Sequence, residues 1–258
     1  MTSDPGPRTS DGAQSAPWLI HLDEVPSTNT WALDHFQALA HGAVVWTTRQ
    51  TGGRGRGGKV WMAPPGVLTA SVVLHLPTPP GPLALAAGLA VLHAAEDLTP
   101  GLRIGLKWPN DLVVGRRKLA GLLVERPSAQ VAVVGVGLNL AAHWEGDLAE
   151  QRTSLTDHGA DLNTDVASQV SALTAIRRYL LEASGLLRAG GFANLLPTLR
   201  ERDVLAGQVV AVQDGARIHG GIAGGFDDAG RLLVGATPVT SGTVTSWVST
   251  VSDGPSAL

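Results

Sequence analysis

A glycine-rich basic loop over residues 50–61 constrains this chain more than any other feature. Glycines at positions 52, 53, 55, 57 and 58 are interspersed with the cations Arg54, Arg56 and Lys59. Glycine lets backbone N–H groups turn towards an anion and permits positive φ. The preceding residues 43–48 are apolar and largely β-branched, which is typical of a buried strand. The sequence therefore predicts a strand that leads into a loop binding a phosphate or a carboxylate.

Two common phosphate-binding patterns resemble this loop but do not fit it. Gly53, Gly55 and Gly58 have the spacing of a dinucleotide fingerprint, and Lys59 nearly completes a P-loop. Both patterns need a helix directly after the loop, because the helix N-terminus meets the phosphate. Here the run 64–66 reads Pro-Pro-Gly, which does not continue a helix. Side-chain cations and backbone amides must then hold the anion. The alternative is a solvated, disordered basic loop.

Composition excludes several classes of protein. The chain has 258 residues, 44% of them apolar and 16% charged, with a net charge of −3 and no cysteine. These values exclude a disordered chain, a global nucleic-acid footprint, thiolate metal sites and cysteine nucleophiles. No apolar secretory segment is visible in residues 1–17, and the longest mostly apolar run, 82–95, is too short to span a bilayer. We therefore expect a cytoplasmic protein without membrane association.

The hydrophobic pattern predicts an α+β fold around a mixed sheet flanked by helices. We expect a disordered tail over 1–16, a turn over 77–82 and an irregular, mobile segment over 143–164. Past Leu205, short strands and turns predict a small β-barrel-like domain. Strands are expected over 18–22, 43–48, 67–76, 104–108, 112–114, 118–125, 131–140 and, in the last domain, 207–212, 217–226, 231–234 and 244–251. Helices are expected from Ser27 and over 83–98, 166–187 and 192–204, the last interrupted by Pro197.

Polar clusters interrupt these apolar segments. Ser27-Thr28-Asn29 either caps a helix or also clasps a polar ligand group. The run 107–111, Lys-Trp-Pro-Asn-Asp, is either an ordinary turn or part of a magnesium–nucleotide site, since Mg²⁺ typically uses one or two carboxylates plus phosphates. Lys118 starts an apolar strand, where its charge either reaches solvent or enters a site. Asn139 lies in a core strand, and its buried amide needs partners that a nucleotide would supply.

No other catalytic signature stands out. The histidines show no metal-ligand spacing with a neighbouring acid or histidine. A nucleophile elbow of the Gly-x-Ser-x-Gly type is absent from the sequence. The polar clusters and the glycine loop are therefore the features from which a function has to be inferred.

Jointly, these motifs resemble the biotin protein ligases. The resemblance implies a mixed-sheet catalytic domain of the class II synthetase type over 17–204, an SH3-like barrel over 205–252 and a tail over 253–258. Gly57 and Val60 stand where many relatives carry basic residues. The matching segments follow the family's order and are Ser27-Thr28-Asn29, Gln50 to Arg56, Trp61, Lys107 to Asp111, Lys118 to Gly121, Gly135 to Asn139 and Thr153-Ser154-Leu155.

The resemblance implies a two-step ligation. Biotin and MgATP form biotinyl-5′-AMP and pyrophosphate, and a lysine of a biotin carboxyl carrier protein then accepts the biotinyl group. By position, Lys118, Arg54 and Arg56 would be catalytic, and Asp111 is a candidate ligand for the Mg²⁺ carried by ATP. The biotin-binding residues would be Ser27, Thr28, Asn29, Gln50, Gly53, Arg54, Gly55, Arg56, Trp61, Lys118, Gly121 and Gly137. The ATP-binding residues would be Arg54, Arg56, Lys107, Asn110, Asp111, Lys118 and Asn139.

Alternatives remain at this point. A lipoate or octanoate ligase or transferase would have the same fold, although a Ser-Thr-Asn cluster suits a ureido ring better than a dithiolane. A biotin- or nucleotide-sensing module would bind its ligand without releasing pyrophosphate. The short, Pro/Ser-rich N-terminal tail leads us to expect no winged helix-turn-helix and no specific DNA binding. The sequence is compatible with a monomer or a homodimer.

Overall fold

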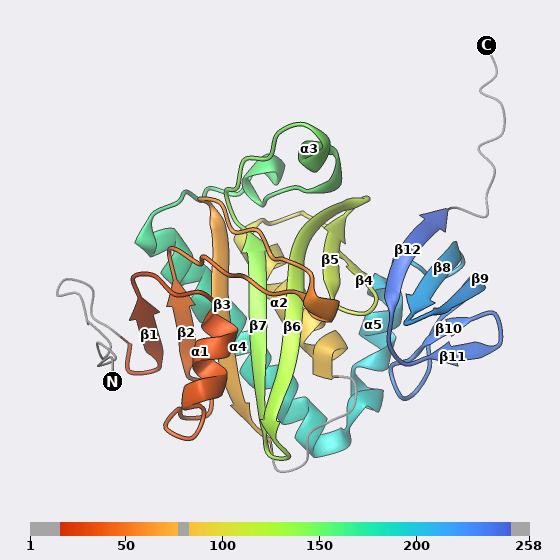
Figure 1. The fold of residues 1–258 in the computed structure, drawn as a ribbon, viewed down its shortest axis with the longest axis horizontal. Coiled ribbons are helices and arrows are strands. Elements are labelled where there is room, and N and C mark those ends of the chain that lie inside the picture. The colour runs from red at the N-terminus through yellow and green to blue at the C-terminus, as the bar shows by residue number, and fades with distance from the viewer. Residues whose placement is uncertain (1–15, 77–82, 249–258) are drawn as a thin grey trace.

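A seven-stranded mixed sheet carries the larger part of the chain (Figure 1). The structure, a computed structural model, describes residues 16–76 and 83–248. The strand order is β1-β2-β3-β7-β6-β5-β4, in which β1 and β2 are parallel and the other neighbours are antiparallel. The strands are β1 (Leu19–Leu22), β2 (Val44–Thr47), β3 (Val67–His75), β4 (Gly105–Lys107), β5 (Asp111–Val114), β6 (Arg117–Ser128) and β7 (Val131–Asn139).

Helices cover the two faces of this sheet unequally (Figure 1). The short helix α1 (Thr28–His35) lies on one face, and Ser27 caps it by accepting a hydrogen bond from the Thr30 amide at 3.3 Å. The long helices α2 (Leu83–Leu98) and α4 (Val166–Gly190) cover the other face and pack on each other. The helix predicted over 83–98 is confirmed, and both of its ends lie where they were predicted. Its Ala- and Leu-rich surface is almost wholly buried, and each fully buried Leu or Val contributes about 1.5–3 kcal/mol.

In the central strands β3 and β7, large apolar side chains alternate with small or polar ones, which leaves room for a cavity on the face that carries α1. Residues of β3 and β7 that face α2 and α4 are large and apolar, such as Leu68, Val72 and Leu138. Between them on these strands stand small or polar residues, because side chains alternate across a strand. These are Thr69 and Ser71 in β3 and Gly135, Gly137 and Asn139 in β7.

A second, five-stranded antiparallel sheet follows, with the order β11-β10-β9-β8-β12. The short strand β11 was not predicted, and the strand expected to reach residue 251 is described only to Val248. The mixed α+β class is confirmed, whereas barrel closure and a boundary at Leu205 stay predictions. The strands are β8 (Val209–Asp214), β9 (Arg217–Phe226), β10 (Leu232–Val234), β11 (Thr237–Val239) and β12 (Thr243–Val248).

Two predictions about where helices lie were wrong, one for the helix over 192–204 and one for the segment 143–164. Pro197 does not interrupt a helix but lies in the first turn of α5 (Leu196–Arg202), where its missing N–H costs no hydrogen bond. The segment 143–164, expected to be irregular, contains α3 (Asp147–Gln151) and a 3₁₀ turn over Thr156–His158. Residues 1–15 of the tail expected over 1–16, the turn expected over 77–82 and residues 249–258 lie outside the described residues.

The second sheet docks beside the site through several contacts. In the segment that leads from α5 to the second sheet, the Val204 amide donates to the Leu106 carbonyl at 3.1 Å. On β12, the Trp247 carbonyl accepts from the Arg116 guanidinium, whose carbon lies 4.2 Å from the centroid of the Trp247 ring. Strand β12 is therefore held against the turn between β5 and β6. Among the described residues, no helix has the length and apolar character needed to cross a membrane.

Candidate active site

The glycine-rich loop folds into a hairpin. Arg54 and Val60 form an antiparallel bridge, and the Gly55 amide donates to the Lys59 carbonyl at 2.7 Å. The hairpin closes through a 3₁₀ turn in which Gly57 has φ 63°. A side chain at that φ would be strained, so glycine is what allows the turn. Backbone hydrogen bonds between the two arms hold the hairpin together, and the glycine-rich sequence gives no local sign of them.

Strand register brings separate motifs into one row across the sheet. Thr69, Gly137, Gly121, Asp111 and Lys107 are successive Cα partners on β3, β7, β6, β5 and β4. The row is glycine in its middle and charged at one end. It therefore forms a shallow floor on which a ligand can lie, with ionic groups at one side.

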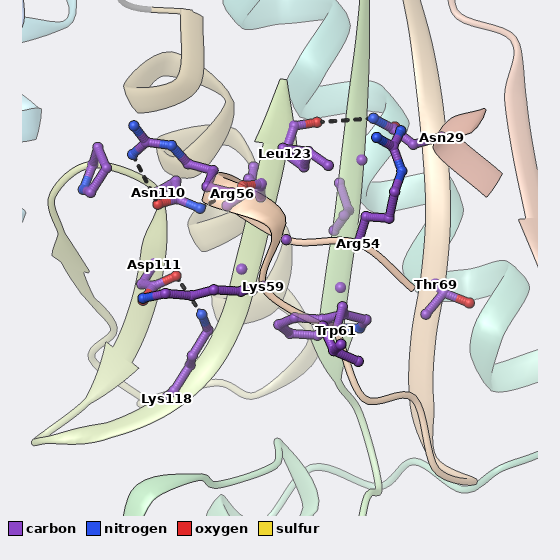
Figure 2. Close-up of a pocket in the computed structure, with 18 of the residues that line it drawn as sticks. Asn29, Arg54, Arg56, Lys59, Trp61, Thr69, Asn110, Asp111, Lys118 and Leu123 are labelled. Atoms are coloured by element: carbon purple, nitrogen blue, oxygen red, sulfur yellow. Dashed lines mark hydrogen bonds and ion pairs between the residues drawn. The ribbon is translucent and has the colours of Figure 1, made fainter. Parts of the chain in front are cut away.

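Trp61 lies on this floor, across β6 and β7 (Figure 2). A Cβ atom on Gly137 would stand 2.2 Å from the Trp61 ring, and one on Gly121 would stand 2.9 Å from it. Only glycine at these two positions lets the indole approach the strands so closely. The Lys118 Nζ lies 5.4 Å from the ring centroid. The close approach of the Trp61 ring to the sheet thus explains why Gly121 and Gly137 are glycines.

A hydrogen-bonded polar corner, formed by Ser27, Thr28, Asn29, Gln50 and Ser71, closes the α1 end of the floor. The Gln50 Oε1 accepts from the Thr28 amide at 3.0 Å. The Ser71 Oγ lies 2.9 Å from both Thr28 Oγ1 and Asn29 Oδ1. Ser27 caps α1 at the same time, so capping and clustering of polar groups occur together. Gly135 makes room for the corner, because a Cβ there would stand 2.7 Å from Asn29 Oδ1.

A cation cluster, formed by Arg56, Lys107, Lys118 and Arg152, surrounds Asp111 at the other end. The Lys118 Nζ pairs with Asp111 Oδ1 at 2.5 Å. Burial lowers the pKa values of Arg56, Lys107 and Arg152, and the charge of Asp111 opposes each shift. Four cations around one carboxylate leave a positive excess that attracts anionic groups. In Figure 2, Lys59 and Lys118 both point towards Asp111.

The floor, the cation cluster and the polar corner, apart from the fully buried Ser71, line one cavity of about 330 Å³. Its volume lies at the lower end of the range for small-molecule sites. From the second sheet, Gly242, Thr243 and Val244 complete its wall. The predicted site residues that line it are Ser27, Thr28, Asn29, Gln50, Arg54, Gly55, Arg56, Trp61, Lys107, Asn110, Asp111, Lys118, Gly121 and Gly137.

Two predicted site residues, Gly53 and Asn139, lie behind the cavity lining. A Cβ on Gly53 would stand 2.4 Å from the Trp61 carbonyl, so this glycine lets the two arms of the hairpin meet. The Asn139 Nδ2 donates to the carbonyls of Thr153 at 2.8 Å and Lys118 at 3.2 Å, which fixes the start of β6. Its buried Oδ1 has no partner among the described residues.

Sequence reasoning missed four contributors to the site. Arg152 stacks over Trp144, with its guanidinium carbon 4.5 Å from the ring centroid, and lines the cavity. Its only sequence signal is its position directly before the Thr153-Ser154-Leu155 motif. Ser71 is a hydroxyl in an apolar strand, and Glu125 is an acid at the end of one. The wall from β12 has no local signal at all, because it reaches the cavity only through docking of the second sheet.

The acidic groups of the described residues do not build a metal site on their own. No group of three His, Asp or Glu side chains within residues 16–76 and 83–248 is arranged to hold a metal ion. A single carboxylate, Asp111, faces the cavity among the lining residues. This donor set suits an Mg²⁺ that arrives on substrate phosphates, since such ions typically keep only one or two protein carboxylates.

Comparison with known proteins agrees with this geometry. The model of the "Biotin/lipoate A/B protein ligase family" matches residues 21–139. A biotin–[acetyl-CoA-carboxylase] ligase of Mycobacterium tuberculosis is 36% identical over 236 residues, which cover 85% of this chain and 86% of that protein. The chain belongs to the biotin protein ligase family.

Other members of the biotin protein ligase family match over most of their length. A biotin–[acetyl-CoA-carboxylase] ligase of Paracoccus denitrificans is 29% identical over 224 residues, covering 83% of this chain and 92% of that protein. The Aquifex aeolicus biotin protein ligase, solved in complex with biotin and ATP, has a TM-score of 0.77 and 26% identity, and the match covers 90% of this chain and 98% of that one. The resemblance inferred from the motifs is confirmed.

Proposed function

We propose that this chain is a biotin protein ligase that activates biotin with ATP and transfers it to a lysine of a biotin carboxyl carrier protein. One observation carries the proposal. A single cavity joins a neutral polar corner to a cation cluster across a floor of glycines. Biotin has a neutral ureido ring at one end and a carboxylate at the other, so it fits this polarity.

The polar corner is the proposed seat of the ureido ring. This ring offers two N–H donors and one carbonyl acceptor, and buried polar groups of a ligand need matching partners. Thr28 and Asn29 are buried and already oriented by hydrogen bonds to Gln50 and Ser71. The valeryl chain then follows the floor over Gly121 and Gly137, beside Trp61.

The cation cluster is the proposed place of adenylation. The biotin carboxylate attacks the α-phosphorus of ATP, and pyrophosphate leaves. Two anions meet in this step, and Lys118 and Arg56 offset their repulsion and the charge that develops at phosphorus. The Arg54 guanidinium pairs with Glu125 beside the polar corner in this structure, and we propose that it joins them when the ligands bind. When bound with ATP, Mg²⁺ neutralises phosphate charge, and Asp111 is its candidate ligand. Lys107, Asn110 and Asn139 are proposed to bind the nucleotide.

The hairpin and Trp61 are proposed to shield the acyl adenylate from water, which would otherwise hydrolyse it. In the second step, the neutral ε-amine of the carrier lysine attacks the acyl carbon, the bond to the phosphate oxygen breaks, and AMP leaves. The carrier is the acceptor domain of a biotin-dependent carboxylase. Because the reaction consumes ATP, we place it in the cytoplasm.

The first test measures pyrophosphate with ATP and either biotin, lipoate or octanoate as the acid. We expect release with biotin and none above background with the other two acids, because these lack the urea that the polar corner matches. Adding a biotin carboxyl carrier domain should then increase the mass of the carrier by one biotinyl group.

Two results would contradict the ligase. Biotin binding without pyrophosphate release would favour a sensing module. Pyrophosphate release or acyl transfer with lipoate or octanoate alone would favour the related transferases. A carrier domain whose acceptor lysine is replaced by arginine is the matched control for the mass measurement.

A further inference from the structure

Glu125 connects the polar corner to the glycine-rich hairpin from outside the cavity lining. Its Oε2 accepts from Asn29 Nδ2 at 2.6 Å and from Arg54 Nη2 at 2.9 Å. Its side chain is 28% exposed, so these hydrogen bonds are partly shielded from water. Glu125 does not line this cavity but lines an adjoining hollow that shares Arg54 with it. We therefore expect Glu125 to affect a ligand in the cavity through the two groups that it holds, Asn29 and Arg54.

A carboxylate fixes hydrogen-bond direction because it only accepts. Asn29 must then turn its amide nitrogen to Glu125, which leaves its Oδ1 to accept from the Ser71 hydroxyl at 2.9 Å. Ser71 has one hydrogen, and Asn29 takes it. The second contact of Ser71, with Thr28 Oγ1 at 2.9 Å, must then have Thr28 as its donor, because two hydroxyl oxygens at this distance need a hydrogen between them.

The consequence concerns the atom that Thr28 presents to the cavity. The Thr28 hydrogen is thus used inside the protein, so the Thr28 oxygen faces the cavity as an acceptor. An acceptor there matches a ring N–H of a cyclic urea. If Asn29 were free to reverse its amide, its nitrogen could donate to Ser71, and Ser71 could then donate to Thr28. The Thr28 hydroxyl would then present its hydrogen to the urea N–H, which is also a donor.

We propose that Glu125 is a positioning residue that sets the hydrogen-bond direction of the polar corner, so that Thr28 accepts from a urea N–H of biotin. This inference rests on the proposed function, because it assigns the urea to the polar corner. It makes Glu125 a determinant of biotin affinity although it does not touch biotin.

The test is titration of the protein with biotin, without ATP, for the parent, Glu125→Met and Glu125→Gln. Methionine keeps the length of the side chain and removes the acceptor. We expect it to raise the Kd for biotin about ten- to hundredfold, the effect of leaving a buried polar group without its partner. Glutamine can still accept from Asn29 through its amide oxygen, so Glu125→Gln should recover most of the affinity.

The kinetic readout separates positioning from a general structural effect. The KM for ATP at saturating biotin should differ by less than about twofold between Glu125→Met and Glu125→Gln, because both variants lose the ion pair with Arg54 and differ only in the acceptor for Asn29. Glu201→Gln is the matched control, because Glu201 forms an exposed ion pair with Arg103 at 3.2 Å. It should change neither constant. Thermal unfolding of each variant confirms that it is folded.

Three results would overturn the proposal: Glu125→Met binding biotin within about twofold of the parent, a KM for ATP that differs between Glu125→Met and Glu125→Gln as much as the biotin Kd does, and a lack of recovery in Glu125→Gln. A parent that binds biotin but releases no pyrophosphate refutes the ligase and leaves this inference testable. A parent that does not bind biotin refutes both.

Discussion

Lys118→Ala is expected to lower biotin-dependent pyrophosphate release by about 100- to 1,000-fold, the usual effect of removing one preorganised group that stabilises transition-state charge. Lys118 stands at the start of β6 with its ammonium in the cation cluster. Its removal takes away a charge that faces both the biotin carboxylate and the α-phosphate in the proposed reaction. Single-turnover formation of biotinyl-5′-AMP measures this step directly.

Loss of Lys118 also leaves its partner Asp111 unpaired, and a double variant separates the two effects. Without Lys118, the Asp111 carboxylate loses its ion pair and adds repulsion towards the phosphates. Lys118→Ala/Asp111→Asn removes that repulsion but not the need for a cation. We expect it to remain at least tenfold below Asp111→Asn alone. Arg117→Ala is the control, since Arg117 is a cation on the same strand outside the cavity lining. Activity of Lys118→Ala within about tenfold of the parent would contradict the assigned role.

Gly137→Val is expected to weaken biotin binding more than about hundredfold, which corresponds to about 2.7 kcal/mol. Gly137 lies in the middle of the cavity floor, and even a Cβ atom there would stand 2.2 Å from the Trp61 ring. A branched side chain would therefore displace the indole and fill the space proposed for the valeryl chain. Titration with biotin measures the effect, and thermal unfolding shows whether the sheet is preserved.

Gly220→Val is the matched control for the floor. Gly220 also lies in a strand, β9, and no described atom stands within 4 Å of the position that its Cβ would take. This substitution should leave the biotin Kd unchanged. If Gly137→Val bound biotin within about tenfold of the parent, the floor would not be the path of the acyl chain.

Local patterns predicted the parts of the fold that depend on local forces. The helix over 83–98 follows from an Ala- and Leu-rich run, and its observed bounds are the predicted ones. The strand β7 follows from an apolar, β-branched run. The observed bounds of β9, like those of the helix over 83–98, are the predicted ones. Pro197 misled us because proline is compatible with the first turn of a helix but not with its interior.

The site was predictable as a set of motifs but not as an arrangement. The resemblance supplied the residues, whereas the strand register supplies their order, in which Gly121 lies between Gly137 and Asp111. Glu125 escaped notice because its partner Asn29 is distant in the chain, at a sequence separation of 96. Contacts of that separation arise only from tertiary folding, so no local pattern marks them.

A crystal structure of the protein with biotinyl-5′-AMP would test the proposed site most directly. We predict the ureido ring in the polar corner, the acyl chain over Gly121 and Gly137, and the Lys118 ammonium on the acyl phosphate. We also predict that the hairpin bearing Arg54 and Arg56 covers the ligand. An adenylate bound elsewhere, or Lys118 turned to solvent with the hairpin away from the ligand, would contradict it.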